Sequence, residues 1–148
     1  MEASGIKTWL IIWKAYEACR ALAQKSIAGL GMCYSDFAVL ELLLHKGPLP
    51  VNSIGEKISL SSGSITTAID RLESRNLVTR QFTPTDRRTR MVALTPSGKA
   101  LIKKHFKRHE EDFAKLTEGL SRKERETLLE LLKKVGKKAR ALSIEGAE

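Results

Sequence analysis

The 148-residue sequence has no apolar run long enough to cross a membrane. Its most apolar early stretch, Trp9–Trp13, ends at Lys14, whereas a transmembrane helix needs about 20 apolar residues. The first residues also lack the basic segment that opens a secretory signal peptide. We therefore expect a cytoplasmic protein with no membrane partner.

Cysteine is scarce, because Cys19 and Cys33 are the only two in the chain. Their positions match no metal-ligand spacing, either with each other or with the three histidines. His105 and His109 are four residues apart, as on one helix face, but no third ligand is nearby. We expect no metal and no cofactor. The cysteines are interpreted as small apolar side chains, and a redox pair is the alternative.

The motifs on which many enzymes depend are also absent. The sequence has no glycine-rich phosphate loop, no Gly-x-Ser-x-Gly turn and no isolated pair of carboxylates in apolar surroundings. We therefore predict that the protein is not an enzyme. Acidic residues are in the minority, with 17 Asp and Glu against 26 Lys and Arg, for a formal charge of +9. This excess favours a polyanionic partner such as nucleic acid.

Apolar spacing predicts two helices in the first third of the chain. The first covers residues 6–28. The second covers 36–45, has Ser35 as its N-cap, and is rich enough in Leu, Val and Phe to be central and buried. The following loop holds at most an edge strand around Leu49–Val51, because proline cannot donate a hydrogen bond to a sheet.

A helix-turn-helix is expected next. A short helix over 52–59 and a turn at 60–63 lead into a second helix that extends to about Asn76. One face of this second helix is apolar, through Ile65, Ala68, Ile69 and Leu72. The opposite face is polar and is expected to be exposed.

A β-hairpin follows, with strands at 77–82 and 89–94 and a turn between them. Thr95 and Pro96 then supply an N-cap and a first helical residue for a long helix to about Thr117. Ser121 and Glu124 form a capping box that opens the last helix.

The long helix and the last helix each carry a narrow apolar stripe that has no obvious partner within so short a chain. His109 lies in the first stripe and is expected to be a hydrogen-bonded, structural histidine. We infer a homodimer built by the first helix and the last two. The predicted fold class is mainly α with a small β-wing (α+β), in which residues 1–33 and 99–148 serve dimerisation and residues 34–98 form a winged helix-turn-helix domain.

The candidate DNA-contacting residues form two groups. Hydroxyls at the start of a helix cap its free amides or contact phosphates and base edges, and arginines at a hairpin tip suit a narrow minor groove. The first group is Ser61, Ser62, Ser64, Thr66, Thr67 and Arg71; the second is Arg87, Arg88 and Arg90. Asp86 is expected to orient a neighbouring guanidinium. Three simpler alternatives remain: Ser61 only caps the helix, Arg71 lies on a solvated face, and Asp86 is an ordinary turn residue.

The segment Asp86–Gly98, which reads DRRTRMVALTPSG, resembles the wing signature of the MarR-type transcriptional regulators, and Leu72–Arg80 resembles the segment before it. The resemblance implies a winged-helix homodimer that binds palindromic promoter DNA, usually as a repressor, and is often released by a small molecule or by cysteine oxidation. The positions that match the recognition helix are Ser62, Ser64, Thr66, Thr67 and Arg71. Arg88 matches the wing-tip arginine that enters the minor groove, and Asp86 the acidic residue that steadies it.

Neither cysteine aligns with the reactive cysteine of the peroxide-sensing branch, which falls near Trp9. An effector pocket like the family's would lie between the winged helix and the dimer helices, and its candidates are Trp13, Tyr16, Tyr34 and Phe37, although core packing explains each of them too. Two other functions are alternatives: a sequence-nonspecific architectural DNA-binding protein, and a winged helix used for protein contacts.

Overall fold

The computed structural model describes residues 4–82 and 90–145. These residues fall into two compact units that divide between Asp112 and Phe113, and each unit is described by itself. Among the described helices, none combines the length and the apolar character of a membrane span.

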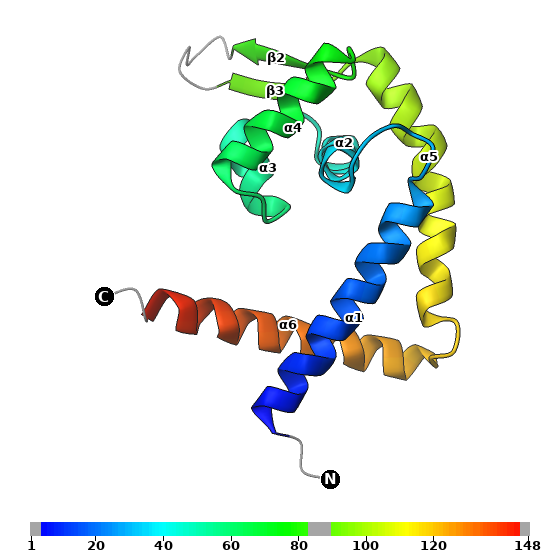
Figure 1. Cartoon of the computed structure of the whole chain (residues 1–148), viewed down its shortest axis with the longest axis vertical. Helices are drawn as coiled ribbons and strands as arrows, with labels where there is room; N and C mark the ends of the chain where they lie inside the picture. The colour runs from blue at the N-terminus through cyan, green and yellow to red at the C-terminus, as the bar shows by residue number, and fades with distance from the viewer. Residues whose placement is uncertain (1–3, 83–89, 146–148) are drawn as a thin grey trace. The chain divides into compact units, whose positions relative to one another are not determined.

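The first unit opens with α1 (Gly5–Ser26), whose N-cap Ser4 accepts a hydrogen bond from the Lys7 N–H at 3.3 Å. α2 (Tyr34–Lys46) follows and lies between α4 and α5 (Figure 1). Its N-cap is Cys33, so the prediction that Ser35 caps this helix is wrong. The extended backbone of Cys33 lets its carbonyl accept the first helical hydrogen bonds, which begins the helix two residues earlier than expected.

The predicted helix-turn-helix is formed by α3 (Val51–Lys57) and α4 (Ser62–Ser74). The two helices approach closely at Gly55, where an added Cβ would lie 3.2 Å from the Leu60 carbonyl oxygen and 3.3 Å from Ile65 Cγ2. A side chain at this position would therefore push α4 away from α3.

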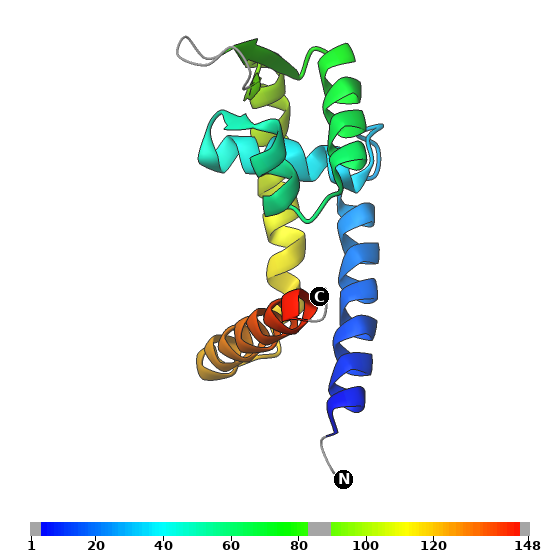
Figure 2. The same cartoon turned by 90° about the vertical axis from the view of Figure 1, so that its left-hand side faces the viewer.

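A three-stranded antiparallel sheet in the order β1-β3-β2 completes the winged helix. β1 (Leu49–Pro50) is the predicted edge strand, and it pairs with β3 (Arg90–Leu94). β3 also pairs with β2 (Val78–Phe82), beside the C-terminal end of α4 (Figure 2). The predicted turn between the hairpin strands lies outside the described residues.

The core of the first unit lies where α2, α3, α4 and α5 meet. α5 (Pro96–Ala114) begins at Pro96, as predicted. The largest side chains with almost no exposed surface include Phe37, Leu40, Ile54, Ile65, Ile69, Leu72 and Ile102. The predicted apolar face of α4 is therefore buried, and its polar face is left exposed.

The second unit consists of a short 3-10 helix, η1 (Lys115–Thr117), and α6 (Arg122–Glu145), together with the end of α5. The predicted capping box is present. The Ser121 N–H donates to Glu124 Oε2 at 2.8 Å, and the Glu124 N–H donates to Ser121 Oγ at 3.3 Å. These bonds lower the pKa of the Glu124 carboxyl.

Candidate nucleic-acid interface

The exposed face of α4 presents a row of hydroxyls from its first two turns. Ser61 is the N-cap, and its Oγ accepts from the Ser64 N–H at 3.2 Å while lying 2.8 Å from Ser64 Oγ. Ser61 therefore has the capping role. The other hydroxyl residues, Ser62, Ser64, Thr66 and Thr67, are all exposed.

The two threonines on this face direct their hydroxyl protons back into the helix. Thr66 Oγ1 donates to the Ser62 carbonyl oxygen and Thr67 Oγ1 to that of Gly63, each at 2.9 Å. In this state the hydroxyl oxygens are left as acceptors and the methyl groups as apolar contacts. A threonine so arranged suits the amino group of adenine or cytosine and the thymine methyl group.

Arg71 lies on the same helix, and its guanidinium holds a carboxylate of α2. Its Nε is 3.1 Å from Asp36 Oδ2 and its Nη2 is 2.6 Å from Asp36 Oδ1. The Asp36 side chain is 4% exposed and that of Arg71 is 45% exposed. The hydrogen bonds to Asp36 raise the pKa of the Arg71 guanidinium further above its usual value. Arg71 thus ties α4 to α2, whatever further contact its outer nitrogens make.

Two more arginines fix the end of α4, and their roles were missed from the sequence. Arg75 donates to the carbonyl oxygens of Leu30 and Gly31 at 3.0 and 2.9 Å, in the loop between α1 and α2. Arg80 of β2 bonds to Asp70 and Glu73 of α4. No local pattern marks these contacts, because their partners become neighbours only in the folded chain.

The wing is described along its two paired strands. Phe82 pairs with Arg90, and the Arg90 guanidinium lies over the exposed Phe82 ring, 5.6 Å from its centroid. Arg90 is thus the first residue of β3. The other predicted wing residues, Asp86, Arg87 and Arg88, lie outside the described residues.

A cavity of about 370 Å³ opens along one face of α2. The residues that line it are Tyr34, Ala38, Glu41, Leu42, His45, Lys46 and Ile58. Burial and the Glu41 charge raise the pKa of the Tyr34 phenol, so the hydroxyl stays a hydrogen-bond donor. Of the four predicted pocket residues, Tyr34 lines this cavity. Phe37 has no exposed surface, and Trp13 and Tyr16 are exposed on α1.

Both cysteines are free thiols. Cys19 is half-buried on α1, whereas Cys33 is exposed and its Sγ accepts a hydrogen bond from Arg71 Nη2 at 3.2 Å. No described cluster of His, Cys, Asp and Glu could hold a metal ion.

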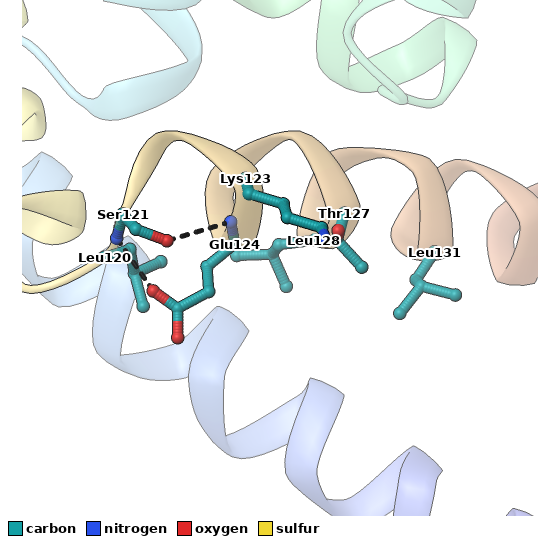
Figure 3. Close-up of a pocket in the computed structure, with 7 residues that line it drawn as sticks. All are labelled: Leu120, Ser121, Lys123, Glu124, Thr127, Leu128 and Leu131. Carbon is teal, nitrogen blue, oxygen red and sulfur yellow. Dashed lines mark hydrogen bonds between the residues drawn. The ribbon is translucent and has the colours of Figure 1, made fainter.

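The second unit contributes an apolar groove of about 630 Å³ along the start of α6 (Figure 3). Leu120, Leu128 and Leu131 line it together with Thr127 and the capping-box residues. Farther along α6, Leu132, Val135, Leu142 and Ile144 are also exposed.

The MarR family model matches residues 34–89, the span of the helix-turn-helix and most of the wing. Over 140 residues the chain is 38% identical to the HTH-type transcriptional regulator MhqR of Bacillus subtilis, which covers 95% of this chain and 97% of that protein. The chain belongs to the MarR family.

Solved structures agree with this membership. A mutant E. coli MarR complexed with operator DNA has a TM-score of 0.80 at 27% identity, over 88% of this chain and 94% of that one. Bordetella bronchiseptica BpsR, whose DNA binding is regulated by 6-hydroxynicotinic acid, has a TM-score of 0.79 at 26% identity, over 88% and 98%. The winged-helix fold class predicted from the sequence is confirmed.

As a MarR-family transcriptional regulator, the protein binds DNA. Its relatives regulate transcription and are not enzymes, so the prediction that the chain is not an enzyme is also confirmed. In helix-turn-helix proteins the second helix of the motif lies in the major groove of DNA. The second helix of the motif in this chain is α4, and its exposed face is polar.

Proposed function

We propose that two copies of this MarR-family regulator bind one palindromic promoter site in the cytoplasm and repress transcription from it. The observation that carries this proposal is the division of α4 into a buried apolar face and an exposed face of hydroxyls. That face reads base edges in the major groove through Ser62, Ser64, Thr66 and Thr67, while Ser61 caps the helix.

Large apolar side chains that are exposed on α1 and α6 support the homodimer. The exposed residues of α1 are Ile6, Trp9, Leu10, Ile11, Trp13 and Tyr16, and those of α6 are Leu128, Leu129, Leu131, Leu132, Val135, Leu142 and Ile144. So many large apolar side chains exposed on one helix indicate an interaction site. A two-fold axis would place the two α4 helices about one turn of duplex apart, roughly 34 Å, and require an inverted repeat in the DNA.

The wing is proposed to contact the adjacent minor groove. Arg88, with Arg87 beside it, carries this contact by its match to the wing signature, and Asp86 orients it. Arg90 lies at the outer end of the described strands, over Phe82, and is proposed to contact phosphate from there.

We further propose that the cavity on α2 holds a small-molecule effector. Its volume suits a small aromatic acid, and Tyr34, His45 and Lys46 offer donors to a carboxylate. 6-Hydroxynicotinic acid is a first probe because it acts on BpsR. Substitution of Ala38 by Trp fills the cavity, so an aromatic acid that displaces DNA from the parent should no longer displace it from this variant.

Selection from a pool of random duplexes tests the proposed function. The expected result is an inverted repeat, and Thr67→Ala should change the preferred base in each half-site more than the overall affinity. Binding that ignores sequence would instead support an architectural protein, and no binding would support a protein-contact module.

A reporter that carries the recovered site should lose expression when the regulator is present; a gain would contradict repression.

A further inference from the structure

Arg80 of β2 is partly buried and contacts two carboxylates of α4. Its side chain is 18% exposed, its Nη2 donates to Asp70 Oδ1 at 2.5 Å, and its Nη1 donates to Glu73 Oε2. The backbone N–H of Arg80 also donates to Glu73 Oε1 at 3.2 Å. Burial lowers the pKa of Arg80, but its hydrogen bonds to Asp70 and Glu73 raise it by more.

These contacts join the recognition helix to the base of the wing. Asp70 and Glu73 are three residues apart and lie on neighbouring turns of α4, so one planar guanidinium spans both. Arg80 is the third residue of β2 and is paired with Val92 of β3. The direction in which the strands leave α4 is therefore set by the ion pairs at Arg80 as well as by the apolar core.

The same contacts reduce the negative charge that α4 presents. Asp70 follows Thr66 by four residues, which places its carboxylate on the face that carries the exposed hydroxyls. Its side chain is 60% exposed. An unpaired carboxylate there would repel phosphate, whereas the single positive charge of Arg80 offsets part of the combined negative charge of Asp70 and Glu73.

We propose that Arg80 is a positioning residue for sequence recognition: by holding Asp70 and Glu73, it keeps the wing and the hydroxyl face of α4 in one fixed arrangement. This inference rests on the proposed sequence-specific binding. Arg80 acts through its two carboxylate partners and makes no contact with the DNA itself.

Removal of a negative charge distinguishes this role from general electrostatics, because the two explanations predict opposite changes in affinity for the preferred duplex. Glu73→Ala removes a negative charge, so electrostatics alone predicts tighter binding to every duplex. Positioning predicts the opposite for the preferred site, because the substitution removes one of the two carboxylates that hold Arg80 and leaves its backbone N–H without the Glu73 acceptor. The matched control is Glu56→Ala, which removes an exposed carboxylate of α3 that has no described ion pair.

The experiment measures affinity for the duplex recovered by selection and for a scrambled duplex of the same length, in the same salt. The ratio of the two affinities should fall at least about tenfold in Glu73→Ala and stay unchanged in Glu56→Ala. Arg80→Lys keeps the positive charge but loses the guanidinium fork, so it should lower the ratio in the same way. Thermal unfolding of each variant establishes the temperature at which all are folded, and Arg80→Lys decides the outcome if Glu73→Ala does not fold.

Tighter binding of Glu73→Ala to both duplexes, with the parent's ratio, would overturn the positioning role. So would a parental ratio in Arg80→Lys. If the parent itself prefers no sequence, the proposed function fails first. A parent that prefers the recovered site while both variants keep its ratio refutes only the role of Arg80.

Discussion

At the scale of single residues, the buried Asp36 carboxylate is held by one arginine. Arg71 donates two hydrogen bonds to this carboxylate, and the Arg71 side chain is itself 45% exposed. Removal of Arg71 therefore leaves a different group unpaired from removal of Asp36. A guanidinium left alone can be solvated, but a carboxylate left alone stays inside the core.

We predict an asymmetry in stability between the two partners. Arg71→Met should lower the free energy of unfolding by on the order of 2–4 kcal/mol, because it leaves a buried charge unpaired. Asp36→Asn should cost less, about 1 kcal/mol, since it removes the charge and retains an acceptor. Urea unfolding measures both. Arg20→Met is the control, because the Arg20–Glu17 pair is exposed and its loss should cost much less than the loss of Arg71. Equal costs for Arg71 and Asp36 would refute the asymmetry.

His109 is a second buried polar residue, and it confirms the expectation of a hydrogen-bonded histidine. Its Nδ1 lies 3.1 Å from Ser26 Oγ, and Ser26 donates its hydroxyl proton to Asp112 Oδ2 at 2.9 Å. The serine oxygen therefore accepts from Nδ1–H, which fixes the tautomer of the neutral ring. Burial lowers the pKa of His109, and the charges of Glu41 and Asp112 offset part of this effect.

A lowered pKa means that the folded chain binds this proton less readily than the unfolded chain does. The free energy of unfolding should therefore fall as the pH drops below about 6.5, the usual histidine value. His109→Gln should flatten this fall between roughly pH 7 and 5, as measured by urea unfolding across that range. An unaltered slope in His109→Gln would contradict the assignment.

At the scale of elements, the winged helix depends on one tight junction between the end of α4 and the start of α5. The carbonyl oxygen of Asn76 accepts from the hydroxyls of Thr95 and Ser97, each at 2.7 Å. The backbone of Asn76 has a positive φ of 55°. Thr95 also caps α5, because its Oγ1 accepts from the Gly98 N–H at 3.0 Å.

Gly98 allows this approach because it has no side chain. A Cβ there would lie 1.9 Å from the Leu77 carbonyl oxygen, so Gly98→Ala requires the backbone to shift. We expect it to lower the free energy of unfolding by about 1–3 kcal/mol. Gly63→Ala in α4, where a Cβ would meet nothing within 4 Å, should show no loss. Chemical unfolding compares the two, and an equal effect would contradict the close contact at Gly98.

Elements were easier to predict from the sequence than contacts. The apolar spacing of Ile65, Ala68, Ile69 and Leu72 is local, and so is the capping box at Ser121, so both could be predicted. The partner of Arg71 is Asp36, which lies 35 residues earlier in the chain on another helix. The partners of Arg80 lie on α4, on the other side of the turn that precedes β2. No spacing rule marks them, and no sequence pattern marks Asp36 as a buried carboxylate.

At the scale of the whole molecule, we propose that positive charge serves DNA binding and that exposed apolar surface serves dimerisation. The net charge of +9 favours DNA as a partner, and the hydroxyl face of α4 is the part of the chain that we propose contacts the bases. In the proposed dimer, the exposed apolar residues of α1 and α6 would contact the second copy. Under the proposed function, one chain would bind each half-site, and the pairing of the two chains would set the spacing between half-sites.

The most direct test of this account is sedimentation of the protein alone and of its complex with the selected duplex. We predict a dimer without DNA and two chains on each duplex, with the half-sites about one helical turn apart. A strictly monomeric chain that binds all duplexes alike would contradict the account.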